Sequence, residues 1–179
     1  MTKITKEQVL ENLEDVKKYI NEAESEAESE AEGIAIKNRS TEDIIFQSTK
    51  TTWKEAVEEA VGNGAKLRYA NLSGANLRDA NLREAKLCDA NLREANLRGV
   101  NLYEANLGGA DLFFANLYKA NLHDTNLCDA NLYGANLREA DLNGAELMNA
   151  KFYGEGGTSK LTKKQLPVFL NSLGFQVEK

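Results

Sequence analysis

The chain has 179 residues, 28% of them charged, and a formal net charge of -6. This length allows one modest domain with appendages, and no stretch approaches the roughly 18 consecutive apolar residues that a membrane span requires. Residues 1–10 lack the apolar core of a signal peptide, so we expect an acidic, soluble, cytoplasmic protein without a membrane segment.

The acidic charge is concentrated near the N-terminus. Residues 1–64 carry a net charge of -7, whereas residues 65–154 are close to neutral at -1. The remaining residues, 155–179, carry +2. The sequence therefore predicts an acidic extension joined to a nearly neutral body, and we divide it into segments 1–32, 33–64, 65–154 and 155–179.

The first segment, 1–32, is predicted to form an acidic helix or linker. Thr5 and Gln8 have the spacing of a capping box, and apolar residues recur at alternating spacings of four and three from Val9 onward. Residues 22–30 alternate glutamate with small residues, which is typical of a solvated helix or a frayed linker. The alternative is a short coiled-coil seam that joins two chains, formed by Leu13, Val16 and Ile20.

The second segment, 33–64, is predicted to be a hairpin followed by a helix. Residues 34–37 and 44–47 are apolar runs separated by a polar turn. Thr52 with Glu55 forms a capping box, and the helix should end at the glycines of residues 62–64. We expect this segment to cap the adjoining repeats through Trp53, Val57 and Val61.

The third segment, 65–154, repeats Ala-Asn-Leu-x-x without insertion or deletion. Leucine stands at every fifth position from Leu67 to Leu147, and alanine stands two residues earlier, except at Val100 and Thr125. A period of five fits neither an α-helix nor a strand. If four pentapeptides complete one coil, the segment forms about 4.5 coils stacked at the ordinary strand spacing, with leucine pointing inward.

The run Lys-Leu-Arg-Tyr-Ala-Asn-Leu-Ser-Gly-Ala at residues 66–75, and its continuation, resembles the pentapeptide-repeat family. This resemblance implies a mainly β fold, a right-handed quadrilateral β-helix or solenoid. The inward leucines, the outward polar residues and the need for caps at both ends follow from the repeat itself.

The last segment, 155–179, is predicted to be a C-terminal helical cap. Residues 155–159 form a flexible break, and four apolar residues then lie on one helical face, namely Leu166, Phe169, Leu170 and Leu173. The alternative is a homodimer contact, so the protein is expected to be a monomer or a homodimer through its terminal helices.

The sequence offers little to support catalysis. His123 is the one histidine of the chain, and no nucleophile, base and orienting group come together around it. Cys88 and Cys128 lie forty residues apart, which is not a zinc-binding spacing, and we interpret them as free thiols. We therefore predict a protein that is not an enzyme and has no catalytic residue, no cofactor and no metal.

The outward residues of the repeats indicate a binding surface. When they are aligned every twenty residues, two neighbouring columns collect most of the arginine and aromatic side chains. Exposed phenylalanine is unusual, and these residue types dominate interface hot spots. The candidate partner-binding face is Arg78, Arg93, Arg98, Phe113, Phe114, Tyr118, Tyr133, Arg138 and Tyr153.

The competing interpretation of these columns is purely structural. Each of four arginines, Arg78, Arg93, Arg138 and Arg83, is followed by an acidic residue. Such neighbours form exposed ion pairs worth at most about 1 kcal/mol each, and tyrosines stacked along a column pack on one another.

The sequence leaves three functions to be distinguished. The first is a non-catalytic interaction or scaffold module for an unidentified protein partner. The second is a DNA mimic: similarity to the quinolone-resistance members of the family implies a DNA-binding enzyme, such as a type II topoisomerase, as the partner. Its acidic surface would be Asp79, Glu84, Glu104 and Asp124. Direct nucleic-acid binding is not expected, because acidic residues interrupt the arginine columns.

Overall fold

The computed structural model of the protein describes residues 17–18 and 33–152. Contacts divide the chain into two units, residues 1–32 and residues 33–179. In the first unit, Lys17 and Lys18 are helical and exposed. The rest of the predicted N-terminal helix with its seam, and the whole C-terminal cap, lie outside the described residues.

The second unit begins with a β-hairpin. Strand β1 (Ala35–Lys37) pairs antiparallel with strand β2 (Ile44–Gln47), where the sequence predicts the two strands. The Asn38 carboxamide oxygen accepts a hydrogen bond from the backbone N–H of Ser40 at 2.8 Å, which tightens the turn. Ile36 of β1 is fully buried, so the hairpin contributes one side chain to the core.

Helix α2 (Trp53–Gly62) follows the hairpin. Thr52 caps its N-terminus, because the threonine hydroxyl oxygen accepts from the backbone N–H of Glu55 at 3.3 Å and donates to the Glu55 carboxylate at 2.7 Å. Asn63 ends the helix, and Gly64 follows at a φ of 71°. The buried face of α2 consists of Ala56, Val57 and Ala60.

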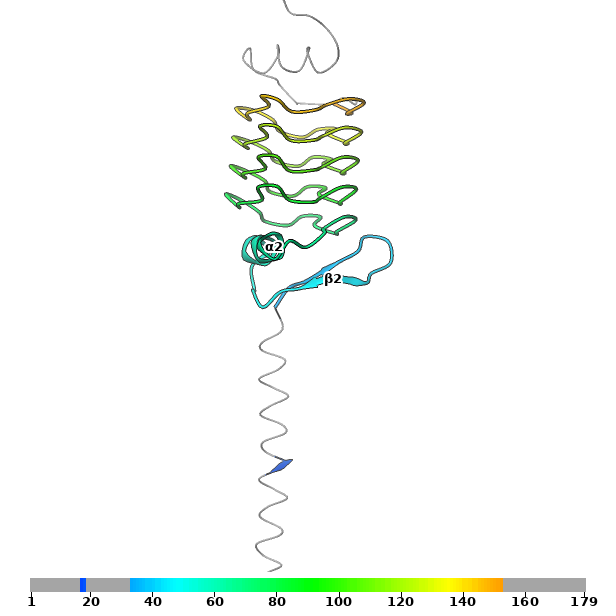
Figure 1. Ribbon diagram of the computed structural model, residues 1–179, viewed down its shortest axis with the longest axis vertical. Coiled ribbons are helices and arrows are strands. Elements are labelled where there is room, and N and C mark those ends of the chain that lie inside the picture. Colours follow the sequence, from blue (N-terminus) through cyan, green and yellow to red (C-terminus); the bar gives the residue numbers. More distant parts are fainter. Residues whose placement is uncertain (1–16, 19–32, 153–179) are drawn as a thin grey trace, which may run out of the picture. The chain divides into compact units, whose positions relative to one another are not determined.

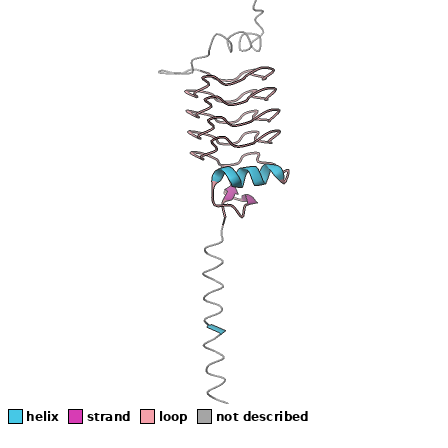
Figure 2. Cartoon of the chain, turned by 90° about the vertical axis from the view of Figure 1, so that its left-hand side faces the viewer, coloured by secondary structure: helices cyan, strands magenta, loops and turns pink. Residues whose placement is uncertain are grey.

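From residue 65 onward the chain forms a β-helix of four-sided coils. Parallel bridges join residues twenty apart, from Lys66 with Lys86 to Asn131 with Lys151. Each pentapeptide is therefore one side of a coil, and the coils stack directly on one another (Figures 1 and 2). The predicted twenty-residue coil is confirmed over the described residues.

The repeat can place all five backbone N–H groups of a pentapeptide in hydrogen bonds. In the pentapeptide of residues 90–94, the alanine N–H closes a turn, the asparagine N–H bonds the coil before it, and the leucine N–H bonds the coil after it. The fourth N–H bonds the asparagine side chain, and the fifth bonds the coil after it. The acceptor oxygens belong to Leu87 (3.1 Å), Ala70 (2.8 Å), Asp111 (2.8 Å), Asn91 (3.2 Å) and Phe113 (2.8 Å).

The two variable residues of each pentapeptide form the middle of a β-turn. The second of them has a positive φ in all seventeen turns of the described repeats, between 53° and 71°, as a type II turn requires. Only five of these positions are glycine. The other twelve side chains are therefore held in a conformation that costs roughly 1–2 kcal/mol for a residue with a Cβ.

Leucine and alanine of the repeats make one continuous core. Leu67 through Leu137 are almost completely buried, and so are the alanines between them. Val100 and Thr125 replace alanine without harm to the packing. The buried Thr125 hydroxyl donates to the Leu102 carbonyl oxygen at 2.7 Å, so no polar group is left unpaired there.

The hairpin and α2 close the first coil. The Asn71 N–H donates to the Lys37 carbonyl oxygen at 2.8 Å, and the Glu58 carboxylate accepts from the Asn81 N–H at 2.7 Å. Trp53 and Val61 pack partly buried against the core. The N-terminal cap thus replaces a missing coil with strand pairing on one side and a side-chain acceptor on another.

Two further bonds tie the hairpin to α2. The Ser48 hydroxyl donates to the Glu59 carboxylate, which also accepts from the Thr49 N–H at 3.2 Å. The hydrogen bond from Ser48 is the main cause that lowers the pKa of Glu59.

Among the described residues, no helix combines the length and the apolar character needed to cross a bilayer.

Candidate functional site

The twenty-residue register sorts the outward residues of the described repeats into four faces. Face 1 begins at residue 65, face 2 at residue 70, face 3 at residue 75 and face 4 at residue 80. Each face returns every twenty residues, so face 2 comprises residues 70–74, 90–94, 110–114, 130–134 and, at the end of the described residues, 150–152.

An aromatic ladder runs along face 2. The Arg93 guanidinium lies over the Phe113 ring at 4.0 Å from its centroid. Phe113 in turn stacks on Tyr133, with centroids 5.1 Å apart and an interplanar angle of 22°. Phe114 meets Phe113 edge to face at 4.5 Å. The three rings therefore form one cluster, with a cation at one end.

Phe114 is the unusual member of this cluster. It is 52% exposed and has a φ of 54°, so it gains little from burial and occupies a backbone region that disfavours a bulky residue. Its ring lies on Gly134 of the next coil: a Cβ at that glycine would stand 3.0 Å from two ring atoms. Gly134 thereby leaves room for the ring.

Face 3 carries the second predicted column. The Arg98 guanidinium lies 4.7 Å from the Tyr118 ring centroid, and the Tyr118 hydroxyl donates to the Glu139 carboxylate at 3.0 Å. Arg78 and Arg138 are exposed. Face 3 follows face 2 directly in the chain, so the two columns stand at successive turns of each coil. We call these two neighbouring columns together the aromatic corner: Arg93, Phe113, Phe114, Tyr133, Arg98, Tyr118 and Arg138.

Two predicted residues do not join the aromatic corner. Arg78 lies in the first coil of face 3, and its guanidinium pairs with Asp79 at 3.2 Å. Tyr153 lies outside the described residues.

The expected ion pairs form only in part. Arg78 and Arg83 each pair with the acidic residue that follows them, at 3.2 Å and 3.1 Å. Arg93 instead pairs with Asp111 at 3.0 Å, and Glu139 pairs with Lys119 at 3.5 Å. Both pairs cross to a neighbouring coil: Asp111 stands at the asparagine position of the coil after Arg93, and Glu139, at a φ of 59°, stands one coil after Lys119.

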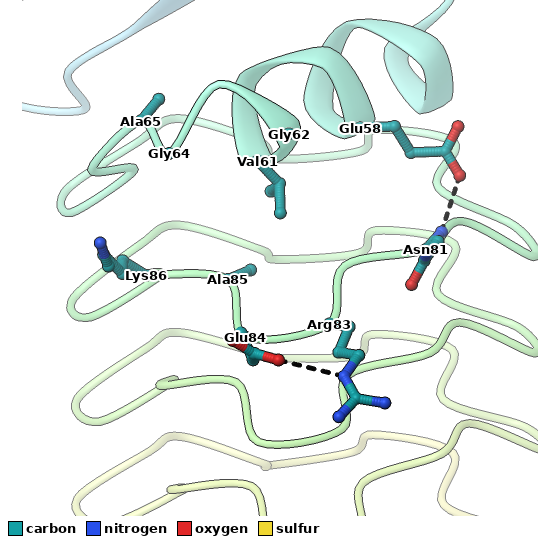
Figure 3. Close-up of a pocket in the computed structure, with 10 residues that line it drawn as sticks. All are labelled: Glu58, Val61, Gly62, Gly64, Ala65, Asn81, Arg83, Glu84, Ala85 and Lys86. Atoms are coloured by element: carbon teal, nitrogen blue, oxygen red, sulfur yellow. Dashed lines mark hydrogen bonds and ion pairs between the residues drawn. The ribbon is translucent and has the colours of Figure 1, made fainter.

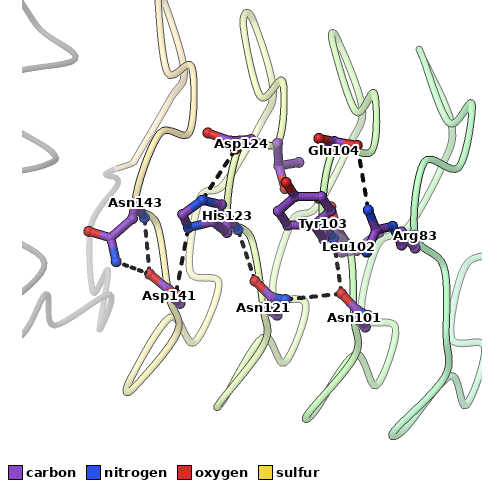
Figure 4. A network of polar contacts seen from close by, with 11 residues as sticks. Arg83, Asn101, Leu102, Tyr103, Glu104, Asn121, His123, Asp124, Asp141 and Asn143 are labelled. Atoms are coloured by element: carbon purple, nitrogen blue, oxygen red, sulfur yellow. Dashed lines mark hydrogen bonds and ion pairs between the residues drawn. The ribbon is translucent and has the colours of Figure 1, made fainter.

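Face 4 carries the predicted acidic residues Glu84, Glu104 and Asp124 in a single column, by the twenty-residue register. Figure 4 shows two of them, Glu104 and Asp124, on neighbouring coils. Asp79, the fourth member of that prediction, is on face 3. Face 4 has one cation against four carboxylates, a net charge of -3, whereas face 3 has four cations against two, a net charge of +2. The carboxylates of face 4 are Glu84, Glu104, Asp124 and Asp141.

These acids are partly compensated. Arg83 pairs with Glu84 at 3.1 Å and reaches Glu104 at 3.9 Å, while His123 lies 3.2 Å from Asp124. Glu104 raises the pKa of the Tyr103 phenol, mainly through a hydrogen bond and further through its charge. His123 stacks on Tyr103 at 5.4 Å between centroids, as an element of this column.

A hollow of about 650 Å³ lies where α2 meets the first two coils (Figure 3). Its wall combines residues of α2 and its C-terminal end, among them Glu58, with polar side chains of faces 4 and 1, namely Asn81, Arg83, Glu84 and Lys86. Glu58 already accepts from Asn81, and Arg83 pairs with Glu84. Its polar groups are thus largely occupied in closing the first coil.

The described residues contain no group of three metal-ligating side chains. Cys88 and Cys128 are free thiols, as predicted, and both are partly exposed on face 1.

Sequence reasoning missed three contributors to the aromatic corner. Gly134 makes room for Phe114, Asp111 holds Arg93, and Lys119 lies 5.3 Å from the Tyr118 ring centroid. Aligning the second variable residue every twenty positions would have paired Phe114 with Gly134. The Asp111 contact carries no comparable signal, because asparagine or aspartate is expected at that position in any case.

Four-sided coils with this register define a β-helical repeat protein. The family model for pentapeptide repeats matches the chain in eight copies over residues 58–83, 75–112 and 114–154. These segments cover more than half of the chain, which therefore belongs to the pentapeptide-repeat family.

Solved structures of related proteins are also similar. A pentapeptide repeat protein from Nostoc is 32% identical, with 71% of this chain and 96% of that one covered, at a TM-score of 0.48. One from the thylakoid lumen of Arabidopsis thaliana is 30% identical over 56% and 70%, at 0.41. QnrB1, a plasmid-mediated fluoroquinolone resistance protein, is 17% identical over 64% and 73%, at 0.20. No curated protein matches the sequence.

Proposed function

We propose that the protein is a non-catalytic interaction module that binds a protein partner through the aromatic corner. Phe114 carries this proposal. An exposed phenylalanine in a left-handed turn neither adds to the core nor suits its backbone. Residues that break a local rule without a structural gain are expected at functional positions.

The surroundings of Phe114 support the same role. Phe113 and Tyr133 hold its ring, and Arg93 extends the cluster as a stacked cation. Rigid aromatic side chains bind partners with little loss of conformational entropy. Because the β-helix fixes their backbone, the corner is organised before a partner arrives.

The test is the substitution Phe114→Asn. Asparagine tolerates a positive φ, so the turn should keep its geometry while the aromatic surface is lost. The matched control is Tyr69→Asn, since Tyr69 is also an aromatic residue at positive φ, 36% exposed, but in the first coil of face 1. Full-length proteins are cross-linked in lysate of the native host, and captured proteins are quantified by mass spectrometry.

We expect at least one protein to be captured by wild type and by the Tyr69 variant and to be lost with the Phe114 variant. Circular dichroism should show that all three proteins are folded. The same captured set for all three would contradict the proposal.

The alternative function is a DNA mimic that inhibits or protects a DNA-binding enzyme, such as a type II topoisomerase. The observation in its favour is the column of carboxylates on face 4, with its net charge of -3. A supercoiling assay with stoichiometric protein tests it. Inhibition or protection that is lost in the triple variant Glu84→Gln, Glu104→Gln, Asp124→Asn is expected, and no effect across a wide range of protein would reject this alternative.

A further inference from the structure

Two arginines of face 3 lack a carboxylate partner among the described residues. The first is Arg98. In the turns of Arg78 and Arg83 the next residue is acidic and forms the ion pair. In the turn of Arg98 the next residue is Gly99, which has no side chain, and no ion pair to the Arg98 guanidinium forms within residues 33–152.

The second is Arg138. It is followed by Glu139, but that carboxylate is taken by the other neighbours: it accepts from the Tyr118 hydroxyl at 3.0 Å and pairs with Lys119 at 3.5 Å. Arg138 itself is exposed and forms no ion pair within the described part of the chain. Both guanidinium groups are thus exposed and have no carboxylate in an ion pair among residues 33–152.

Their spacing suits an extended segment. Arg98 and Arg138 stand two coils apart, on either side of Tyr118, which corresponds to about 10 Å at the ordinary strand spacing. Arg98 stacks on the Tyr118 ring with its centre 4.7 Å from the ring centroid. A stacked guanidinium uses its planar face and keeps its N–H edge for a carboxylate.

We propose that the aromatic corner binds an acidic protein segment, whose carboxylates pair with Arg98 and Arg138 and whose apolar side chain packs on Phe114. This rests on the proposed function and names the chemistry of its partner. Charge complementarity supports an acidic partner, because face 3 carries a net charge of +2. Face 4, which adjoins face 3, carries a net charge of -3. Face 4 would repel the same segment and so fix where it lies.

A nucleic acid fits this surface less well. Phosphate backbones are bound by continuous tracks of cations, and each contact adds to a strong salt dependence. Here two guanidinium groups lie beside a face of net -3, on a chain of net charge -6. A protein segment with a few carboxylates needs only the two groups that are present.

The test selects random dodecapeptides displayed on phage against the full-length protein, with counter-selection on the double variant Arg98→Gln, Arg138→Gln. We expect the retained peptides to combine aspartate or glutamate with an apolar residue. A synthesised peptide from this set, measured by fluorescence anisotropy, should bind about tenfold more weakly to each single arginine variant and more weakly in high salt.

Arg78→Gln is the matched control, because Arg78 occupies the same column one coil before Arg98 but is paired with Asp79. Its affinity for the peptide should equal that of wild type. Circular dichroism of each variant separates lost binding from lost folding.

Three outcomes would overturn the inference. Neutral or basic peptides that depend on Phe114 but not on the arginines would overturn the acidic partner and leave the proposed function standing. Tighter binding of a single-stranded DNA oligonucleotide that depends on both arginines would assign the site to nucleic acid. If no selected peptide depends on Phe114 or on either arginine, both the inference and this use of the corner fail.

Discussion

Face 3 and face 4 lie side by side on the same coils and differ in almost everything that a partner would meet. Leucines behind both faces are completely buried, and their backbones make the same bonds to the neighbouring coils. Yet face 3 carries +2 and face 4 carries -3. The alanine and leucine of each pentapeptide therefore supply the core that stabilises the fold, while the two variable residues give neighbouring faces opposite charges.

The largest effects are expected when a core leucine behind each face is replaced by alanine. Leu97→Ala, behind Arg98, and Leu102→Ala, behind Tyr103, should each lower the free energy of unfolding by about 3 kcal/mol or more, because each leaves a cavity in a close-packed interior. Urea unfolding followed by circular dichroism measures both. Values that differ by more than about 2 kcal/mol would show that the two faces do not share one core equally.

Two glycines of face 2 test the packing around Phe114. Gly74 and Gly134 have the same φ of 67°, but a Cβ at Gly74 meets nothing within 4 Å, whereas one at Gly134 meets the Phe114 ring. Gly74→Ala should destabilise by about 1 kcal/mol through backbone strain, and Gly134→Ala by about 1 kcal/mol more through displacement of the ring. Thermal unfolding tests the difference, and equal effects would mean that Phe114 moves freely.

A smaller effect is expected from the one cation of face 4. Arg83→Gln removes an ion pair with Glu84 and a guanidinium 4.3 Å from the Tyr103 centroid, so stability should fall by about 0.5–1 kcal/mol at low salt and less at high salt. Arg138→Gln, which removes no ion pair within the described residues, is the control and should be nearly neutral. A loss of equal size in both variants would contradict the role of pairing.

The smallest effect concerns the titration of Tyr103 rather than overall stability. Glu104 raises the pKa of this phenol, so Glu104→Gln should lower that pKa toward the ordinary value near 10. The pKa of Tyr103 is higher in the folded protein than in the unfolded chain, so the protonated phenol stabilises the fold. This stabilisation is fully present below the pKa of the unfolded chain and is lost as the pH rises through the pKa of the folded protein. Spectrophotometric titration measures the shift, and an unchanged pKa would show that Glu104 does not act on Tyr103.

The sequence predicted the β-helix closely because a strict period leaves one register for the leucines. It also predicted the hairpin and α2, since the capping residues Thr52 and Glu55 are local signals that the structure uses as expected.

The contacts of the candidate site were less accessible from sequence. Residue spacing assigned each side chain to a column, but it did not decide which neighbour a flexible side chain would choose. Arg93 lies near both Glu94 and Asp111 and pairs with the second. Such choices depend on the direction that each side chain takes across the stacked coils, which a count of residues does not contain.

The twenty-residue register also makes the surface sensitive to the unit of insertion or deletion. Removing a block of twenty residues shortens the rod and leaves every later side chain on its face. Removing five, such as residues 105–109, would carry Phe113 from face 2 to face 1 and separate it from Arg93. Gene rearrangement in units of five residues therefore changes which side chains share a face while the leucine and alanine core is kept. Rearrangement in units of twenty residues changes only the length of the β-helix.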